Sequence, residues 1–191
     1  MNETLNSKDR KLLLELAREA ITSAVLTGPL PASEVTAAEL LGRQGCFVTI
    51  KLNGTLRGCI GNFHSEKPLY QLVQEMAVSA ATRDPRFYPM KEEDLDGFEL
   101  EISVLSPLTK ISGPEEVVVG THGLYLEKNF SRGVLLPQVA VEQGWSREVF
   151  LNQTALKAGL KRDDWKEGAD LYVFTAQVFG EDSPSEAAAI R

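Results

Sequence analysis

The chain has 191 residues and a formal net charge of −7, with 20 lysines and arginines against 27 aspartates and glutamates. This length suits one sizeable core, or one main domain with a small appendage, and 43% hydrophobic residues is an ordinary value for a globular protein. The acidic balance and the lack of a basic run make nucleic acid an unfavourable partner, because a phosphate backbone would meet a repulsive average field.

The first expected element is an amphipathic helix over residues 12–25, where apolar residues recur at helical spacing. Ser7 is available as its N-cap, and Gly28-Pro29 closes the pattern. A loop follows, and residues 33–41 have room for a short helical turn. The continuous apolar stripe indicates that this helix lies on a sheet or on another helix.

A β-hairpin is expected next. Two apolar runs, residues 46–52 and 55–60, flank Asn53-Gly54, a dipeptide suited to a two-residue turn with positive φ at both central positions. With this turn Leu52 faces Thr55, and position 46 faces position 61.

The only two cysteines, Cys46 and Cys59, are then offset on neighbouring strands, which disfavours a disulfide and favours a reduced compartment. No stretch approaches the roughly 20 apolar residues that span a bilayer, and no apolar signal segment opens the chain. We therefore expect a cytoplasmic protein with no membrane contact.

The second hairpin strand runs into the motif Arg57-Gly58-Cys59-Ile60-Gly61, close to His64. Glycines weaken a strand, so two of them around one cysteine suggest a bulge, or a place where something approaches the backbone closely. The alternative is that Cys59 is a small buried hydrophobic residue and that the glycines only permit a bend.

A second helix is expected over residues 69–80, with Pro68 at its first position and Asp84-Pro85 ending it. Two prolines stiffen the following segment, residues 84–89, which presents Arg86 from a rigid loop. The alternative is a plain connection from helix to strand with Phe87 in the core.

The remaining strands are expected over residues 98–104, 117–119, 124–127, 134–136 and 171–179. Turns place His122 before the third of these strands and Arg132 at the start of the fourth, and Pro137-Gln138 follows. The last strand is apolar on both faces, which predicts a central position in a sheet. A helix from Ser146 to about residue 158 ends at Gly159.

Helices and strands are interspersed without regular βαβ alternation, and two connections read as hairpins. This pattern favours an α+β fold, with a largely antiparallel sheet flanked by helices and a smaller β-rich lobe at about residues 107–143. We expect residues 1–180 to form a single domain and residues 181–191 to be a flexible tail.

The chemistry that the residues allow is narrow. Two cysteines and two histidines without paired spacing are too few for a structural zinc site, so no metal is expected. There is no phosphate-binding loop, dinucleotide fingerprint or nucleophile elbow, and no cofactor is predicted. The candidate catalytic residues are Cys59, His64 and His122.

The candidate binding residues are Arg57, Gly58, Gly61, Arg86, Arg132 and Gln138. An arginine beside a thiol favours the thiolate, and an imidazole nearby can act as base. The same arginines can instead hold a carboxylate or phosphate, and each residue also has an ordinary structural explanation. We expect Cys59 to converge on one cleft with the three arginines and His122.

Several of these motifs together are similar to those of one family. They are the segments 56–61, Asp84-Pro85-Arg86-Phe87, His122-Gly123-Leu124, Arg132-Gly133, 135–140 and 142–145. In this order the chain resembles the AMMECR family, also called AmmeMemoRadiSam system protein A in microbes. The resemblance covers the chain from the first helix to Phe179.

The resemblance implies an α+β fold, a cytoplasmic location, and association with a Memo-type protein and a radical SAM protein, but no established reaction. Many members have a second cysteine where this chain has Ala155, so a mechanism with two thiols does not suit this protein. The main hypothesis is a binding module for a small anionic ligand or a partner protein. The alternative is an enzyme that uses Cys59 as nucleophile or redox group, and a nucleic-acid-associated protein comes third.

Overall fold

The computed structural model describes residues 5–32 and 34–181 of the chain. The expected tail at 181–191 therefore lies almost wholly outside the described residues. The chain forms two compact units. Unit 1 comprises the described residues up to Leu105 together with residues 177–181, and unit 2 comprises Ser106–Ala176.

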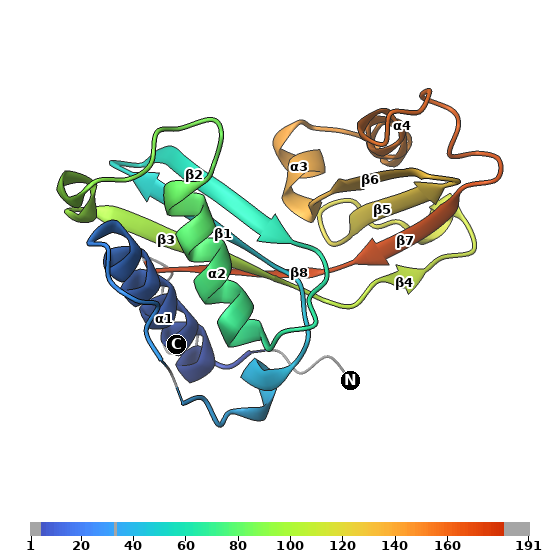
Figure 1. Ribbon diagram of the computed structural model, residues 1–191. Coiled ribbons are helices and arrows are strands. Elements are labelled where there is room, and N and C mark those ends of the chain that lie inside the picture. Colours follow the sequence, from blue (N-terminus) through green and yellow to red (C-terminus); the bar gives the residue numbers. More distant parts are fainter. Residues whose placement is uncertain (1–4, 33, 182–191) are drawn as a thin grey trace, which may run out of the picture. The chain divides into compact units, whose positions relative to one another are not determined.

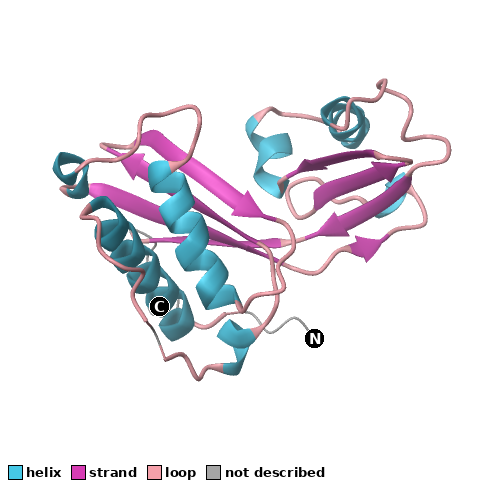
Figure 2. Cartoon of the chain, in the orientation of Figure 1, coloured by secondary structure: helices cyan, strands magenta, loops and turns pink. Residues whose placement is uncertain are grey.

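The fold is α+β, as predicted, and each unit holds a four-stranded antiparallel sheet (Figure 2). In unit 1 the strand order is β2-β1-β3-β8. These strands are β1 (Cys46–Leu52), β2 (Thr55–Asn62), β3 (Phe98–Leu105) and β8 (Ala176–Gly180). Helices α1 (Ser7–Val25) and α2 (Leu69–Thr82) lie side by side on one face of this sheet (Figure 1).

Helix α1 buries the apolar stripe that its sequence predicts, including Leu13 and Ile21, against β3 and α2. Its N-cap is Asn6 rather than Ser7. The Asn6 side chain accepts hydrogen bonds from the backbone N–H groups of Lys8 and Asp9, at 2.9 and 3.0 Å, and so satisfies two donors of the first turn.

The hairpin of β1 and β2 has the predicted turn, with φ of 51° at Asn53 and 73° at Gly54, and Leu52 faces Thr55. The register then shifts by one residue, because Arg57 has no partner position on β1. The expected bulge is therefore present.

The bulge moves every later pair, so that Cys46 faces Asn62 and not position 61. Cys59 faces Thr49, and both cysteines are free thiols. The one-residue shift is the reason why the predicted register was wrong at the far end of the hairpin.

Helix α2 is confirmed, with Pro68 as its N-cap rather than its first helical residue. It packs on β1 and β2 at very short range. A Cβ atom at Gly58 would lie 2.2 Å from the carbonyl oxygen of Ala80. Strand β2, which carries the Arg57–Gly61 motif and is called the motif strand below, therefore needs a glycine here to pack against the helix. The sequence predicted that something approaches the backbone closely at the motif glycines, and at Gly58 this neighbour is helix α2.

In unit 2 the strand order is β4-β7-β5-β6. These strands are β4 (Thr109–Lys110), β5 (Gly123–Lys128), β6 (Ser131–Leu135) and β7 (Asp170–Phe174). Helices α3 (Pro137–Glu142) and α4 (Arg147–Lys157) pack on β5 and β6 around a core centred on Phe150. The predicted Ser146 cap of α4 is confirmed. Three short 3-10 helices complete the described elements, at Ala38–Leu41, Glu92–Leu95 and Pro114–Glu116.

The segment 171–179, predicted as one strand, forms parts of two strands, β7 and β8. It is interrupted at Thr175, so that β7 is central in the unit 2 sheet and β8 lies at the edge of the unit 1 sheet. Thr175 and Ser106 form a reciprocal pair there, because the Ser106 N–H donates to the Thr175 carbonyl and the Thr175 N–H donates to Ser106 Oγ. An apolar pattern on both faces could not reveal that the segment serves two sheets.

No strand forms at residues 117–119, all of which the structure describes. The backbone groups there are used locally: the Val117 carbonyl accepts from Arg147 Nε at 2.8 Å, and the Val118 N–H donates to His122 Nδ1. The segment after β6 forms α3, a short helix that the sequence analysis did not predict. Within the described ranges no helix is both long and apolar enough to cross a membrane.

Candidate functional site

The motif strand β2 lies at the edge of its sheet, and the loop after α2 covers the backbone of its cysteine. The Cys59 N–H donates to Asp84 Oδ2 at 2.9 Å, and the Cys59 carbonyl accepts from Arg86 Nη2 at 3.3 Å. Both backbone groups of Cys59 that point away from β1 are thereby paired. Covering an edge in this way removes a template for unwanted strand pairing.

Asp84 and Arg86 also bind each other, and we call this pair with its two backbone contacts the Asp84–Arg86 clamp. Arg86 Nε lies 2.9 Å from Asp84 Oδ1 and Nη2 lies 2.7 Å from Oδ2, while the Arg86 N–H also donates to Oδ1. The Asp84 carboxylate is buried. Its pKa is held well below the usual range, chiefly by the hydrogen bonds from the Arg86 side chain.

The second arginine of the site, Arg57, is more enclosed. Its side chain is 17% exposed, and Nη2 lies 3.2 Å from Asp94 Oδ2. Its Nη1 group is buried and has no hydrogen-bond partner within the described part of the chain. The Phe87 ring lies 6.0 Å from the guanidinium carbon of Arg57 and 5.4 Å from that of Arg86. One aromatic ring therefore contacts both cations.

The Cys59 side chain points to the sheet face opposite the helices, because Gly58 faces α2 and side chains alternate along a strand. The thiol is half-buried, and the Thr49 hydroxyl donates to its Sγ across the strand pair at 3.3 Å. The pKa of Arg86 is raised, mainly by its hydrogen bond to Asp84 and to a smaller extent by the charge on the Cys59 sulfur.

Each of the two histidines has a partner within its own unit. His64 lies beyond the end of β2 with its side chain 79% exposed, and its Nε2 contacts Glu66 at 3.2 Å. His122 is in unit 2, where its Nδ1 accepts the Val118 N–H at 3.2 Å, so a neutral ring carries its proton on Nε2. Among the described residues of unit 1, the hydrogen bond to Cys59 Sγ comes from Thr49 and none comes from His64.

The other unit 2 candidates have local partners or local roles. Arg132 is 67% exposed and pairs with Glu127 at 3.0 Å. Gln138 stands in the first turn of α3, and its buried Oε1 accepts no hydrogen bond from any described residue. The structure thus groups Arg57, Cys59 and Arg86 within unit 1. That all five expected residues share one cleft remains a prediction.

At both motif glycines, Gly58 and Gly61, neighbouring atoms leave no room for a side chain. A Cβ atom at Gly61 would lie 2.3 Å from the Phe47 ring, much as one at Gly58 would meet α2. Sequence reasoning missed Asp84, Asp94 and Thr49 as parts of the site. Only Asp84 had a local signal, since an aspartate two residues before an arginine can accept its backbone N–H. In the described part of the chain no group of three or more potential metal ligands occurs.

The Asp84–Arg86 clamp predicts a pH-dependent contribution to stability. Asp84→Asn should lower the free energy of unfolding by about 2 kcal/mol near neutral pH, because the buried partner of Arg86 loses its charge. The folded pKa lies below the ordinary value of 3.8, so the contribution is complete above that value and is lost as pH falls toward the folded pKa.

Urea unfolding of both proteins between about pH 7 and about pH 2 measures this difference. Asp96→Asn, at an exposed carboxylate of the same unit, is the control and should behave as the wild type. A difference that stays constant down to the lowest pH would contradict the assignment.

Comparison with known proteins shows which family the chain is similar to. A family model described as AMMECR1 matches residues 14–179. A protein from Methanosarcina acetivorans is 37% identical over 189 residues, covering 94% of this chain and 95% of that protein. Protein MK0488 from Methanopyrus kandleri is 40% identical, covering 96% and 94%.

The fold is also found among solved structures. The crystal structure of the uncharacterised protein PH0010 from Pyrococcus horikoshii matches with a TM-score of 0.81 and 41% identity, covering 91% of each chain. The family match spans both units and includes the motif strand, the Asp84–Arg86 clamp and the unit 2 hairpin. The chain belongs to the AMMECR1 family.

Proposed function

We propose that this protein is a binding module that recognises a small anionic group beside the motif strand. The observation that carries the proposal is the pair of guanidinium groups, Arg57 and Arg86, held around the Phe87 ring next to Cys59. Guanidinium groups bind carboxylates and phosphates through paired N–H donors.

Both arginines are held in place and still have donors to offer. Asp94 fixes Arg57, whose Nη1 has no partner among the residues described, and Asp84 fixes Arg86, whose side chain is 53% exposed. A guanidinium has five N–H donors, and neither carboxylate uses them all. Because the side chains are already ordered, an anion does not have to order them on binding.

We extend the proposal to the partners and the compartment: the protein acts in the cytoplasm with a Memo-type protein and a radical SAM protein. Membership of the AMMECR1 family supports this extension. A partner can supply the anionic group as an aspartate, a glutamate or a chain terminus. In sedimentation experiments with each purified partner, a complex supports the extension, and independent sedimentation of all three proteins contradicts it.

The anion site is tested by following backbone amide NMR signals during titration with inorganic phosphate and with malonate. The signals of Cys59 and Phe87 should shift and saturate. Arg57→Gln should weaken binding about tenfold, because a charge-assisted hydrogen bond is lost.

Arg43→Gln is the matched control, because Arg43 is an exposed arginine of the same unit that pairs with Glu66. It should bind the anions as the wild type does. Equal affinity in all three proteins, or shifts confined to other segments, would overturn the proposal.

A second candidate function is an enzyme in which Cys59 acts as a thiolate. The hydrogen bond from the Thr49 hydroxyl to the sulfur favours this candidate. In the described part of unit 1, His64 contacts Glu66 and not the sulfur, which weighs against a thiol activated by this imidazole, and it is why the binding module comes first.

Alkylation with iodoacetamide tests the enzyme candidate. One thiol per native chain should react, at Cys59, because burial raises the pKa of Cys46 to about 12 and hides it until the protein unfolds. Thr49→Val should slow the reaction of Cys59 near neutral pH, whereas Thr55→Val, at an exposed threonine of the same hairpin, should not. If Cys59 reacts as slowly as Cys46, the enzyme candidate is excluded.

A further inference from the structure

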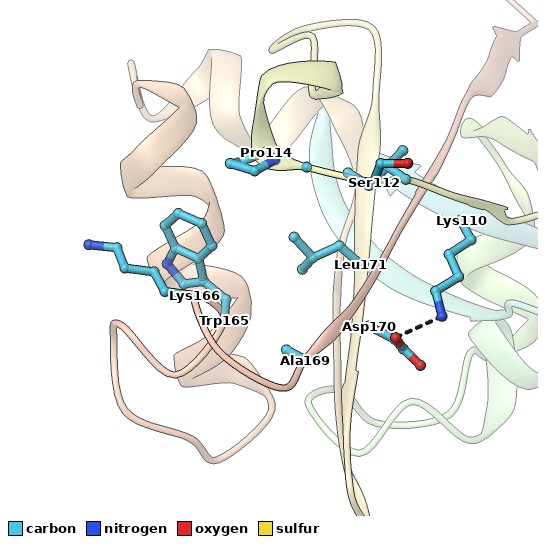
Figure 3. Close-up of a pocket in the computed structure, with 10 residues that line it drawn as sticks. Lys110, Ser112, Pro114, Trp165, Lys166, Ala169, Asp170 and Leu171 are labelled. Atoms are coloured by element: carbon cyan, nitrogen blue, oxygen red, sulfur yellow. Dashed lines mark ion pairs between the residues drawn. The ribbon is translucent and has the colours of Figure 1, made fainter.

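We propose that unit 2 carries a separate binding site for a small aromatic acid, in a pocket of about 520 Å³. The pocket opens where β4 ends beside the start of β7, and its walls are drawn in Figure 3. It is lined by Lys110, Ser112, Pro114, Trp165, Asp170 and Leu171, among others. This inference does not rest on the site at Cys59.

The aromatic wall of the pocket is preformed. The Trp165 indole N–H donates to Asn152 Oδ1 on α4 at 2.7 Å, which fixes the ring and keeps it from turning into the space beside it. Lys166 is held at the rim, 2.7 Å from Asp163 and 5.4 Å from the Trp165 ring. The space therefore exists before a ligand arrives.

The polar groups lie across the pocket from the indole. Figure 3 shows Trp165 on one side, Lys110 with Asp170 on the other, and Leu171 between them. Lys110 Nζ lies 2.8 Å from Asp170 Oδ1, and this contact leaves an ammonium group with further donors. The Ser112 hydroxyl donates no hydrogen bond to a described residue, so it is available to a ligand.

Hydrogen-bond donors and shape together define the ligand class. Lys110 pairs with Asp170, and Lys166 pairs with Asp163 and Glu148, so the lining recognises a carboxylate through the N–H donors that these ammonium groups keep. Trp165, Pro114 and Leu171 present apolar surface suited to a flat ring. The volume falls within the roughly 300–1,000 Å³ of small-molecule pockets. A two-ring aromatic carboxylate meets these conditions, with its ring on the indole and its carboxylate at Lys110.

The test compares 2-naphthoate with the uncharged 2-naphthamide, by amide NMR titration of the full chain. The acid should shift the signals of the pocket segments, residues 110–114 and 165–171, and bind more tightly than the amide. Lys110→Gln should weaken binding of the acid about tenfold and leave the amide unchanged, because only the acid pairs with the ammonium group. Lys157→Gln, at an exposed lysine on α4, is the control.

A second variant tests the space rather than the charge. Ala169 lines the pocket, and Ala169→Leu should fill it and abolish binding of both compounds while the spectrum outside the pocket is kept. Three results would each overturn the proposal: no saturable shift with the acid, shifts outside the pocket segments, or equal binding of acid and amide by the wild type and Lys110→Gln. A variant Ala169→Leu that binds as the wild type does would also overturn it.

Discussion

The Asp84–Arg86 clamp is the interaction on which the candidate site of unit 1 depends. Strand β2 is an edge strand, and an edge strand leaves alternate N–H and C=O groups without a partner. The clamp pairs both such groups of Cys59 and places the Arg86 guanidinium at the backbone carbonyl of Cys59. One carboxylate thus holds the strand, the loop and a recognising side chain in a single arrangement, which explains why Asp84 is buried although it is charged.

The two faces of the motif strand have different structural requirements. Toward the helices, Gly58 lets α2 approach to backbone contact, and an added side chain would collide with Ala80. Toward the other face, the same short segment presents Cys59 with Thr49 at its sulfur. The bulge at Arg57 allows both, because the extra residue turns an arginine toward Asp94 without moving the glycine off the helix.

The local elements could be predicted from the sequence because their signals are local. Asn53-Gly54 specified the turn, and two glycines around a cysteine indicated the bulge. What could not be predicted depends on contacts between distant segments: Thr49 and Asp94 become part of the site only through strand pairing and loop packing. The last strand shows the same limit, since an apolar pattern does not say that Thr175 divides it between two sheets.

Hydrogen exchange at the Cys59 amide measures whether the Asp84–Arg86 clamp holds the edge strand closed. An amide on an open edge strand exchanges readily, whereas one that donates to a buried carboxylate exchanges only when the loop or the strand opens. We predict that the Cys59 N–H is protected to a degree similar to that of the amides of the central strand β1. Exchange as fast as that of an exposed loop amide would contradict the clamp, and with it the placement of Arg86 at the Cys59 carbonyl.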